Sequence, residues 1–221
     1  MLAPLIIHDE RDRAGEQEVV LMLNDFSFTP PEEIFAGLKK GTNMPKMAGP
    51  APSMAAMTRA AQAASAPDLN DVKYDAFLAN DRTLGDPEVI KVEPGGHMLL
   101  RVINSSSMSN YHLQLGQLKG ELIAVDGFQT EPMMASRFPI AVAQRLDIRL
   151  ALPREPAAHP VLAVLEGNRR RTGIVLAAGG VAIPRIAETT GTLSPALTLN
   201  LERQLRAAEP LKPRWQTVRT R

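Results

Sequence analysis

Histidines are the side chains of this chain that most readily bind a metal ion or transfer a proton. There are four, His8, His97, His112 and His159, and none lies close in sequence to another. A protein metal site needs several such ligands to converge, and no spacing here brings two together. His112 falls in a strand pattern, so we expect a half-buried or surface strand residue. The chain has no cysteine, which excludes thiolate metal sites, disulfides and cysteine nucleophiles.

Four methionines form a second possible ligand set. Met44, Met47, Met54 and Met57 lie in a stretch rich in Ala, Met, Pro and Ser. Thioethers are soft ligands that suit Cu(I), so one hypothesis is copper handling. The other is a low-complexity loop in which methionines cluster by composition. The loose spacing and the lack of neighbouring histidines favour the second, and we expect residues 38–67 to be a flexible insertion.

Other polar groups indicate structure rather than chemistry. Asp126 and Asp147 could act as an acid and a base, but nothing in the sequence positions them together. The NSSS run at 104–107 is typical of a turn whose side chains cap backbone groups. The three arginines at 169–171 follow Gly-Asn and indicate a solvated hairpin tip. We therefore expect no catalytic residue, no cofactor-binding residue and no metal ligand in this chain.

The charge balance and hydropathy exclude several classes of partner. Lys and Arg number 25 against 24 Asp and Glu, which gives no field to recruit nucleic acid or an anionic membrane. No apolar run approaches the roughly 20 residues that span a bilayer. The first residues lack a basic segment before their short apolar run, so we expect no signal peptide here.

Short strands separated by turns must position these residues. We predict strands at 18–24, 74–80, 89–92, 97–104, 111–115, 121–125, 145–150, 161–166 and 173–177. In 97–104 the apolar residues alternate, which buries one face and turns Arg101 outward. Residues 25–36 are expected to be a loop with one helical turn, and 201–208 a short helix. Many short strands at close spacing favour a Greek-key sandwich or barrel.

Three stretches, in this order and spacing, resemble the second domain of multicopper oxidases. They are YDAFLAN at 74–80, VEPG at 92–95 with LLRVIN at 99–104, and IAVDG at 123–127 with Glu-Pro at 131–132. The flanks agree with this resemblance. LAPLIIHD at 2–9 resembles the last strand of the preceding domain, and 190–221 resembles the linker toward the third.

The resemblance implies an all-β fold, a cupredoxin-like Greek-key β-sandwich with irregular tails. It divides the chain into four parts. Residues 1–37 would be the terminal part of a preceding cupredoxin domain, 38–67 the Met/Ala/Pro-rich flexible insertion, 68–180 the middle cupredoxin-like domain, and 181–221 a linker or tail.

The resemblance also implies a function and its limits. Multicopper oxidases couple one-electron oxidation of a substrate to reduction of dioxygen to water, and they bind copper through His-x-His, His-x-x-His-x-His and His-Cys-His motifs. This chain has none of these motifs, and a blue-copper centre needs a thiolate and two imidazoles. We therefore expect a fragment that supplies the copper-free middle scaffold, binds no copper and is inactive as an oxidase alone. Met1 would then be a late start.

The expected partners are other cupredoxin domains of the same or a neighbouring polypeptide, in the periplasm or another extracytoplasmic compartment. Two alternatives remain open. One is a copper-free cupredoxin-type envelope scaffold that acts through protein–protein contacts, and the other is copper handling by the methionine loop.

Overall fold

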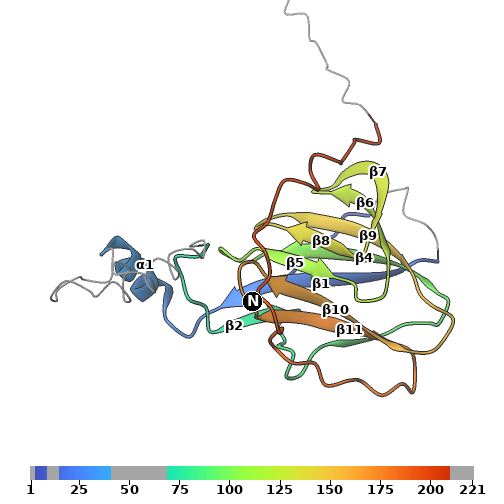
Figure 1. Cartoon of the computed structure of the whole chain (residues 1–221), viewed down its shortest axis with the longest axis horizontal. Helices are drawn as coiled ribbons and strands as arrows, with labels where there is room; N and C mark the ends of the chain where they lie inside the picture. Colours follow the sequence, from blue (N-terminus) through green and yellow to red (C-terminus); the bar gives the residue numbers. More distant parts are fainter. Residues whose placement is uncertain (1–2, 9–14, 41–68, 210–221) are drawn as a thin grey trace, which may run out of the picture.

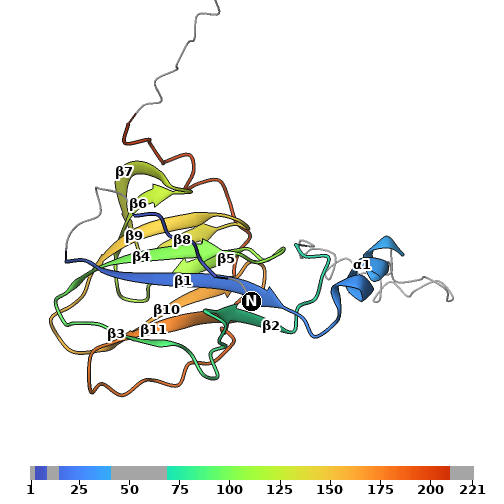
Figure 2. The ribbon, with the colours of Figure 1, turned by 180° about the vertical axis from the view of Figure 1, so that it is seen from behind.

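Two β-sheets packed face to face make up the body of the molecule (Figures 1 and 2). The computed structural model describes residues 3–8, 15–40 and 69–209. Sheet A has the strand order β2 (Ala76–Ala79), β1 (Gln17–Phe26), β4 (His97–Asn104), β9 (Arg145–Ala151), β6 (Gly120–Val125) and β7 (Phe128–Ala135). Sheet B has the order β3 (Val89–Lys91), β11 (Arg171–Ala177), β10 (Ala158–Leu165), β5 (Tyr111–Gln114) and β8 (Arg137–Ile140). The predicted all-β sandwich is confirmed.

The core lies between the sheets and follows the predicted alternation. On β4, Met98, Leu100 and Val102 are buried in the sandwich, and Arg101 lies on the other face. Tyr111 and Phe138, on neighbouring strands of sheet B, are the largest of the fully buried side chains. Burying a Leu or Phe side chain contributes about 1.5–3 kcal/mol relative to leaving it exposed, so the core between the sheets stabilises the fold.

Two strands, β7 and β8, escaped the sequence prediction, and both lie at sheet edges. Each contains a proline, Pro132 in β7 and Pro139 in β8. Proline cannot donate a ladder hydrogen bond and is tolerated at sheet edges, so strand patterns are weakest there. The other predicted strands are present, with ends that shift by up to three residues.

β1 belongs to the same sandwich as the strands that follow it. It pairs in parallel with β4, Val19 opposite Leu100, and antiparallel with β2, Leu23 opposite Ala79. Val19, Leu21 and Leu23 are buried in the common core. The prediction that placed residues 1–37 in a preceding domain is therefore wrong for this strand. Sequence pattern identifies a strand but not the sheet that it joins, since strand pairing depends on distant residues.

Helix α1 (Pro31–Lys39) is longer than the single predicted turn. Proline at its start, Glu32 and Glu33 in the first turn and Lys39 in the last all favour the helix and its dipole. It stands beyond the end of sheet A rather than over a face, and none of its residues is buried (Figure 1). The predicted insertion begins inside α1, and its remainder, with the four methionines, lies outside the described residues.

The segment after β11 is attached to the sandwich over its described length. The Ser194 amide donates to the Asn168 carbonyl at 2.9 Å, and the Leu197 amide donates to the Glu166 carboxylate. Farther on, the Glu131 amide of β7 donates to the Arg206 carbonyl at 2.8 Å. The prediction of a helix at 201–208 is wrong, because these residues form turns and a short bridge to β7. In the described part of the chain, no helix has the length and hydropathy to cross a membrane.

Candidate functional site

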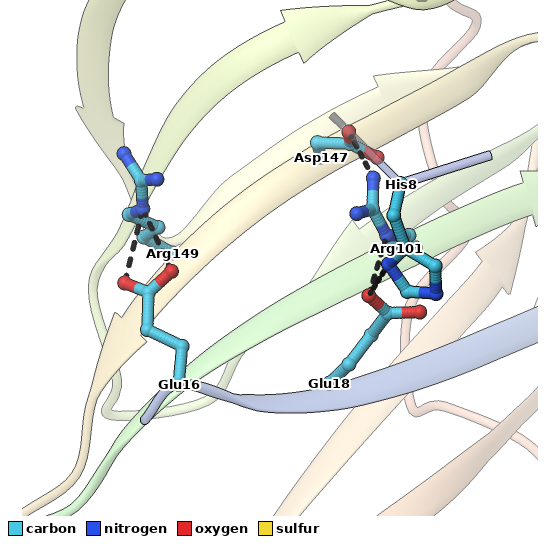
Figure 3. A network of polar contacts seen from close by, with 6 residues as sticks. All are labelled: His8, Glu16, Glu18, Arg101, Asp147 and Arg149. Carbon is cyan, nitrogen blue, oxygen red and sulfur yellow. Dashed lines mark hydrogen bonds and ion pairs between the residues drawn. The ribbon is translucent and has the colours of Figure 1, made fainter. Parts of the chain in front are cut away.

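A set of charged side chains lies on the outer face of sheet A, turned away from the core (Figure 3). Arg101 of β4 is its centre. Its Nη1 donates to Asp147 Oδ2 of β9 at 2.8 Å, and its Nε lies 3.2 Å from Glu18 Oε2 of β1. These three strands are neighbours in the sheet, and Arg101 is in register with Asp147. The three side chains therefore join β1, β4 and β9 across the sheet.

A second ion pair lies beside the first. Arg149 Nε of β9 is 3.0 Å from Glu16 Oε1, at the entry to β1. The side chain of Arg101 is only 12% exposed and that of Arg149 only 18%. Charges held this far from water depend on their partners, since an ion left without its counter-charge keeps the cost of desolvation. The sequence predicted the outward direction of Arg101 correctly but not its burial or its partners.

The N-terminal segment, residues 3–8, lies against this outer face (Figure 2). His8 Nδ1 is 3.6 Å from Glu18 Oε2. Pro4 lines a cavity of about 190 Å³ together with Val20, Met22 and Asn24 of β1. Leu5 and Ile7, by contrast, are 86% and 83% exposed. The segment thus presents alternate apolar side chains to the outside of the molecule.

The histidines do not converge on one another. His97 begins β4 in sheet A, His112 lies within β5 and His159 within β10 in sheet B, and His8 lies on the N-terminal segment. Among the described residues, no group of three or more His, Cys, Asp or Glu side chains could hold a metal ion. The prediction for the methionines is untested, since they lie outside those residues.

His112 is the one histidine that is buried in the described structure. Its Nε2 lies 3.0 Å from the Pro195 carbonyl, in the segment that crosses sheet B after β11. The pKa of His112 is lowered from 6.5, mainly because burial disfavours the charged imidazolium. The hydrogen bond to Pro195 and the charge of Glu166 act in the opposite direction, whereas the charge of Arg137 lowers the pKa further. His112 lies in a strand, as predicted, but it is buried rather than half-buried or at the surface.

This environment predicts an acid dependence of stability. Because the folded-state pKa is lowered, the unfolded chain binds the proton more readily. Neutral His112 therefore makes its full contribution to the free energy of unfolding above pH 6.5, the pKa of the unfolded chain. That contribution is lost as the pH falls toward the lower pKa of the folded state. We expect the free energy of unfolding to fall in this range, and less steeply in His112→Gln. Urea denaturation at a series of pH values measures both curves, and curves of equal slope would contradict this role.

The remaining predicted polar groups are mainly structural. The Asn104 side chain accepts from the Ser106 amide at 3.2 Å and donates to the Ser109 carbonyl at 2.9 Å, which confirms a capped turn after β4. The Asp25 carboxylate of β1 accepts three further bonds from the amides of residues 107–109 at 2.9–3.2 Å. The Asp126 carboxylate accepts from the Arg145 amide at 2.8 Å, whereas Asp147 contacts Arg101.

The arginine run lies at the tip of the β10–β11 hairpin, as predicted, and Arg169 is exposed, but Arg170 and Arg171 are half-buried. Arg170 donates to the carbonyls of Tyr74 and Asp75 and lies 4.6 Å from the centre of the Phe77 ring. Arg171 donates to the Ala187 carbonyl at 2.8 Å. These two arginines hold neighbouring loops, because hydrogen bonds from a charged group to a carbonyl are among the stronger ones.

Comparison with known proteins identifies the fold. The protein resembles Fet3p, described as a multicopper oxidase that functions in iron import, with a TM-score of 0.66 and 13% identity. The match covers 91% of this chain and 35% of Fet3p. The laccase of Botrytis aclada matches with a TM-score of 0.54 and 16% identity, over 80% of this chain and 31% of the laccase. The predicted cupredoxin-like fold is confirmed.

Sequence comparison identifies the family. Laccase-3 of Thanatephorus cucumeris is 29% identical over 113 residues, which are 50% of this chain and 20% of the laccase. Multicopper oxidase MmcO of Mycobacterium tuberculosis is 24% identical over 117 residues, 53% of this chain and 23% of MmcO. The chain thus spans about a fifth to a quarter of these curated relatives. The profile of the family described as "Multicopper oxidase" matches residues 17–178, and the chain belongs to the multicopper oxidase family.

Proposed function

We propose that this chain supplies the copper-free middle domain of a multicopper oxidase. In that role it holds the copper-bearing domains apart and orients them. The neighbouring domains oxidise the substrate one electron at a time and reduce dioxygen to water. Family membership, the cupredoxin-like sandwich and the resemblance of the 74–132 region to the family's second domain support this role.

The observation that carries the proposal is the outward face of the N-terminal segment. Leu5 and Ile7 are 86% and 83% exposed on alternate positions of an extended stretch that is anchored beside the ion pairs of sheet A. Exposing two large apolar side chains to water costs free energy, and a neighbouring domain packed on the segment would bury both. We assign that position to a preceding cupredoxin domain, with the ion pairs beneath keeping the supporting strands in register.

The same proposal places the protein outside the cytoplasm, in the periplasm or an equivalent compartment. This assignment rests on the resemblance to the family. Substrate oxidation is assigned to the assembled oxidase, and the isolated chain is expected to turn over no substrate.

Binding to the preceding domain tests the proposal. The adjoining coding region is expected to encode a cupredoxin domain with His-x-His upstream and another with His-Cys-His downstream. The upstream domain, produced separately, should bind this chain. The double variant Leu5→Glu, Ile7→Glu should weaken that binding about a hundredfold by isothermal calorimetry, since the two lost apolar anchors together cost about 3 kcal/mol. Leu193→Glu is the matched control, because Leu193 is also an exposed leucine, in the segment after β11.

Two alternatives make other predictions. A copper-free envelope scaffold would have no copper-bearing cupredoxin domain in the adjoining coding region, and its partner would be an unrelated protein. Copper handling by Met44, Met47, Met54 and Met57 would give Cu(I) binding that is lost when all four are changed to leucine.

A further inference from the structure

Helix α1 carries an apolar stripe that the sandwich does not cover. Ile34 and Phe35 each lie beside Leu38 on the helix surface, because residues three and four positions apart share a side. Phe35 is 58% and Leu38 is 44% exposed, and no residue of α1 is buried. The preceding connection adds Phe28, which is 82% exposed and whose ring lies perpendicular to that of Phe26, at 5.0 Å between ring centres. This end of the molecule has the character of an interaction surface.

Charges beside the stripe indicate the partner. Glu32 lies in the first turn and Lys39 in the last, and they are seven positions apart. Seven residues are close to two full turns, so both flank the same side of the stripe. Lys39 Nζ lies 4.2 Å from the centre of the Phe35 ring, at the border of the apolar surface. Glu33 and Lys40 are also seven positions apart, but they lie on the side of the helix opposite the apolar stripe.

We propose that α1 is a self-association site, where two copies of this chain pair with their α1 helices antiparallel. A two-fold axis perpendicular to both helices brings the same flank of each copy together. Glu32 of one copy then faces Lys39 of the other, twice, around the joined apolar stripes. The helix dipoles also oppose each other favourably in this arrangement. The surface is complementary to itself, and this selects a second copy over an unrelated apolar partner.

The interface is small. A nine-residue helix and one aromatic side chain bury less area than the roughly 1,000 Å² expected of a stable complex. The pairing is therefore weak and depends on protein concentration. The proposed residues of α1 differ from Leu5 and Ile7 of the proposed domain contact, so separate substitutions test the two proposals.

Sedimentation equilibrium of the full chain tests the proposal. The wild type should show a monomer–dimer equilibrium in the high micromolar range. Glu32→Lys and Lys39→Glu should each lower the association constant about tenfold or more, since each brings like charges together. An equimolar mixture of the two variants should restore association, because the reversed positions again face opposite charges. Glu33→Lys is the matched control and should associate like the wild type.

Each outcome decides the proposal. Phe35→Glu with Leu38→Glu should be monomeric, and circular dichroism should show it to be folded, because both residues are exposed. A wild type that stays monomeric at every concentration overturns the proposal. So does a dimer that survives these substitutions, or a mixture of the two charge variants that remains monomeric.

Discussion

Replacing Gly173 by alanine is expected to lower the free energy of unfolding by about 3 kcal/mol or more. Gly173 lies in β11, opposite Leu162 of β10. A Cβ at this position would lie 2.2 Å from the Val161 carbonyl oxygen and 2.9 Å from the Leu162 Cα. Both are backbone atoms of the paired strand, so neither can move without opening the ladder between β10 and β11.

Urea denaturation of the wild type and Gly173→Ala measures this loss. Gly191→Ala is the matched control, because an added Cβ there meets no other atom within 4 Å. Its free energy of unfolding should stay within about 0.5 kcal/mol of the wild type. Equal stabilities for the two variants would show that β10 and β11 do not approach as described.

Replacing Arg101 by methionine is expected to cost about 3 kcal/mol. The change keeps most of the aliphatic stem but leaves Glu18 and Asp147, which flank the guanidinium on β1 and β9, facing each other without the positive charge. Their attraction to Arg101 becomes mutual repulsion in a poorly solvated place. The loss should appear in thermal and urea unfolding at neutral pH.

Arg82→Met is the control for this prediction. Arg82 also makes an ion pair, 3.0 Å from Asp86, but the two side chains are 50% and 87% exposed. Such surface pairs contribute about 0–1 kcal/mol, so little stability should be lost. A loss at Arg101 no larger than the loss at Arg82 would mean that the outer face of sheet A does not depend on its ion pairs.

The sequence predicted the centre of the sandwich better than its edges. β4 was predicted with one face toward the core because Met98, Leu100 and Val102 recur at every second position. β7 and β8 lie at sheet edges and contain prolines, so the same signature is interrupted. The family resemblance predicted the fold from short motifs that fall at strands and turns of the sandwich.

The charged site could be predicted only in part. Alternation placed Arg101 on the outer face, but its partners come from residues far away in the sequence. Arg101 and Asp147 are 46 positions apart, and the register that aligns them is set by the whole sheet. Glu18 was assigned with its strand to another domain, so a contact with Arg101 could not be expected. The signal was present in retrospect, as charged residues at outward positions of β1, β4 and β9.

The exposed surfaces were the least predictable feature. A sequence shows that Leu5, Ile7, Phe35 and Leu38 are apolar but not that the sandwich leaves them uncovered. Apolar residues are commonly buried, and those that remain exposed can be identified only from the folded structure. The two surface proposals, domain contact at the N-terminal segment and pairing through α1, therefore depend on the structure.

Copper content after reconstitution tests the central proposal most directly. The purified chain is incubated with Cu(I) and separately with Cu(II), passed over a desalting column and assayed by elemental analysis and visible absorption. A copper-free middle domain predicts no stoichiometric copper and no blue thiolate absorption. About one copper retained per chain would contradict it, and loss of that copper when the four clustered methionines are changed to leucine would favour copper handling instead.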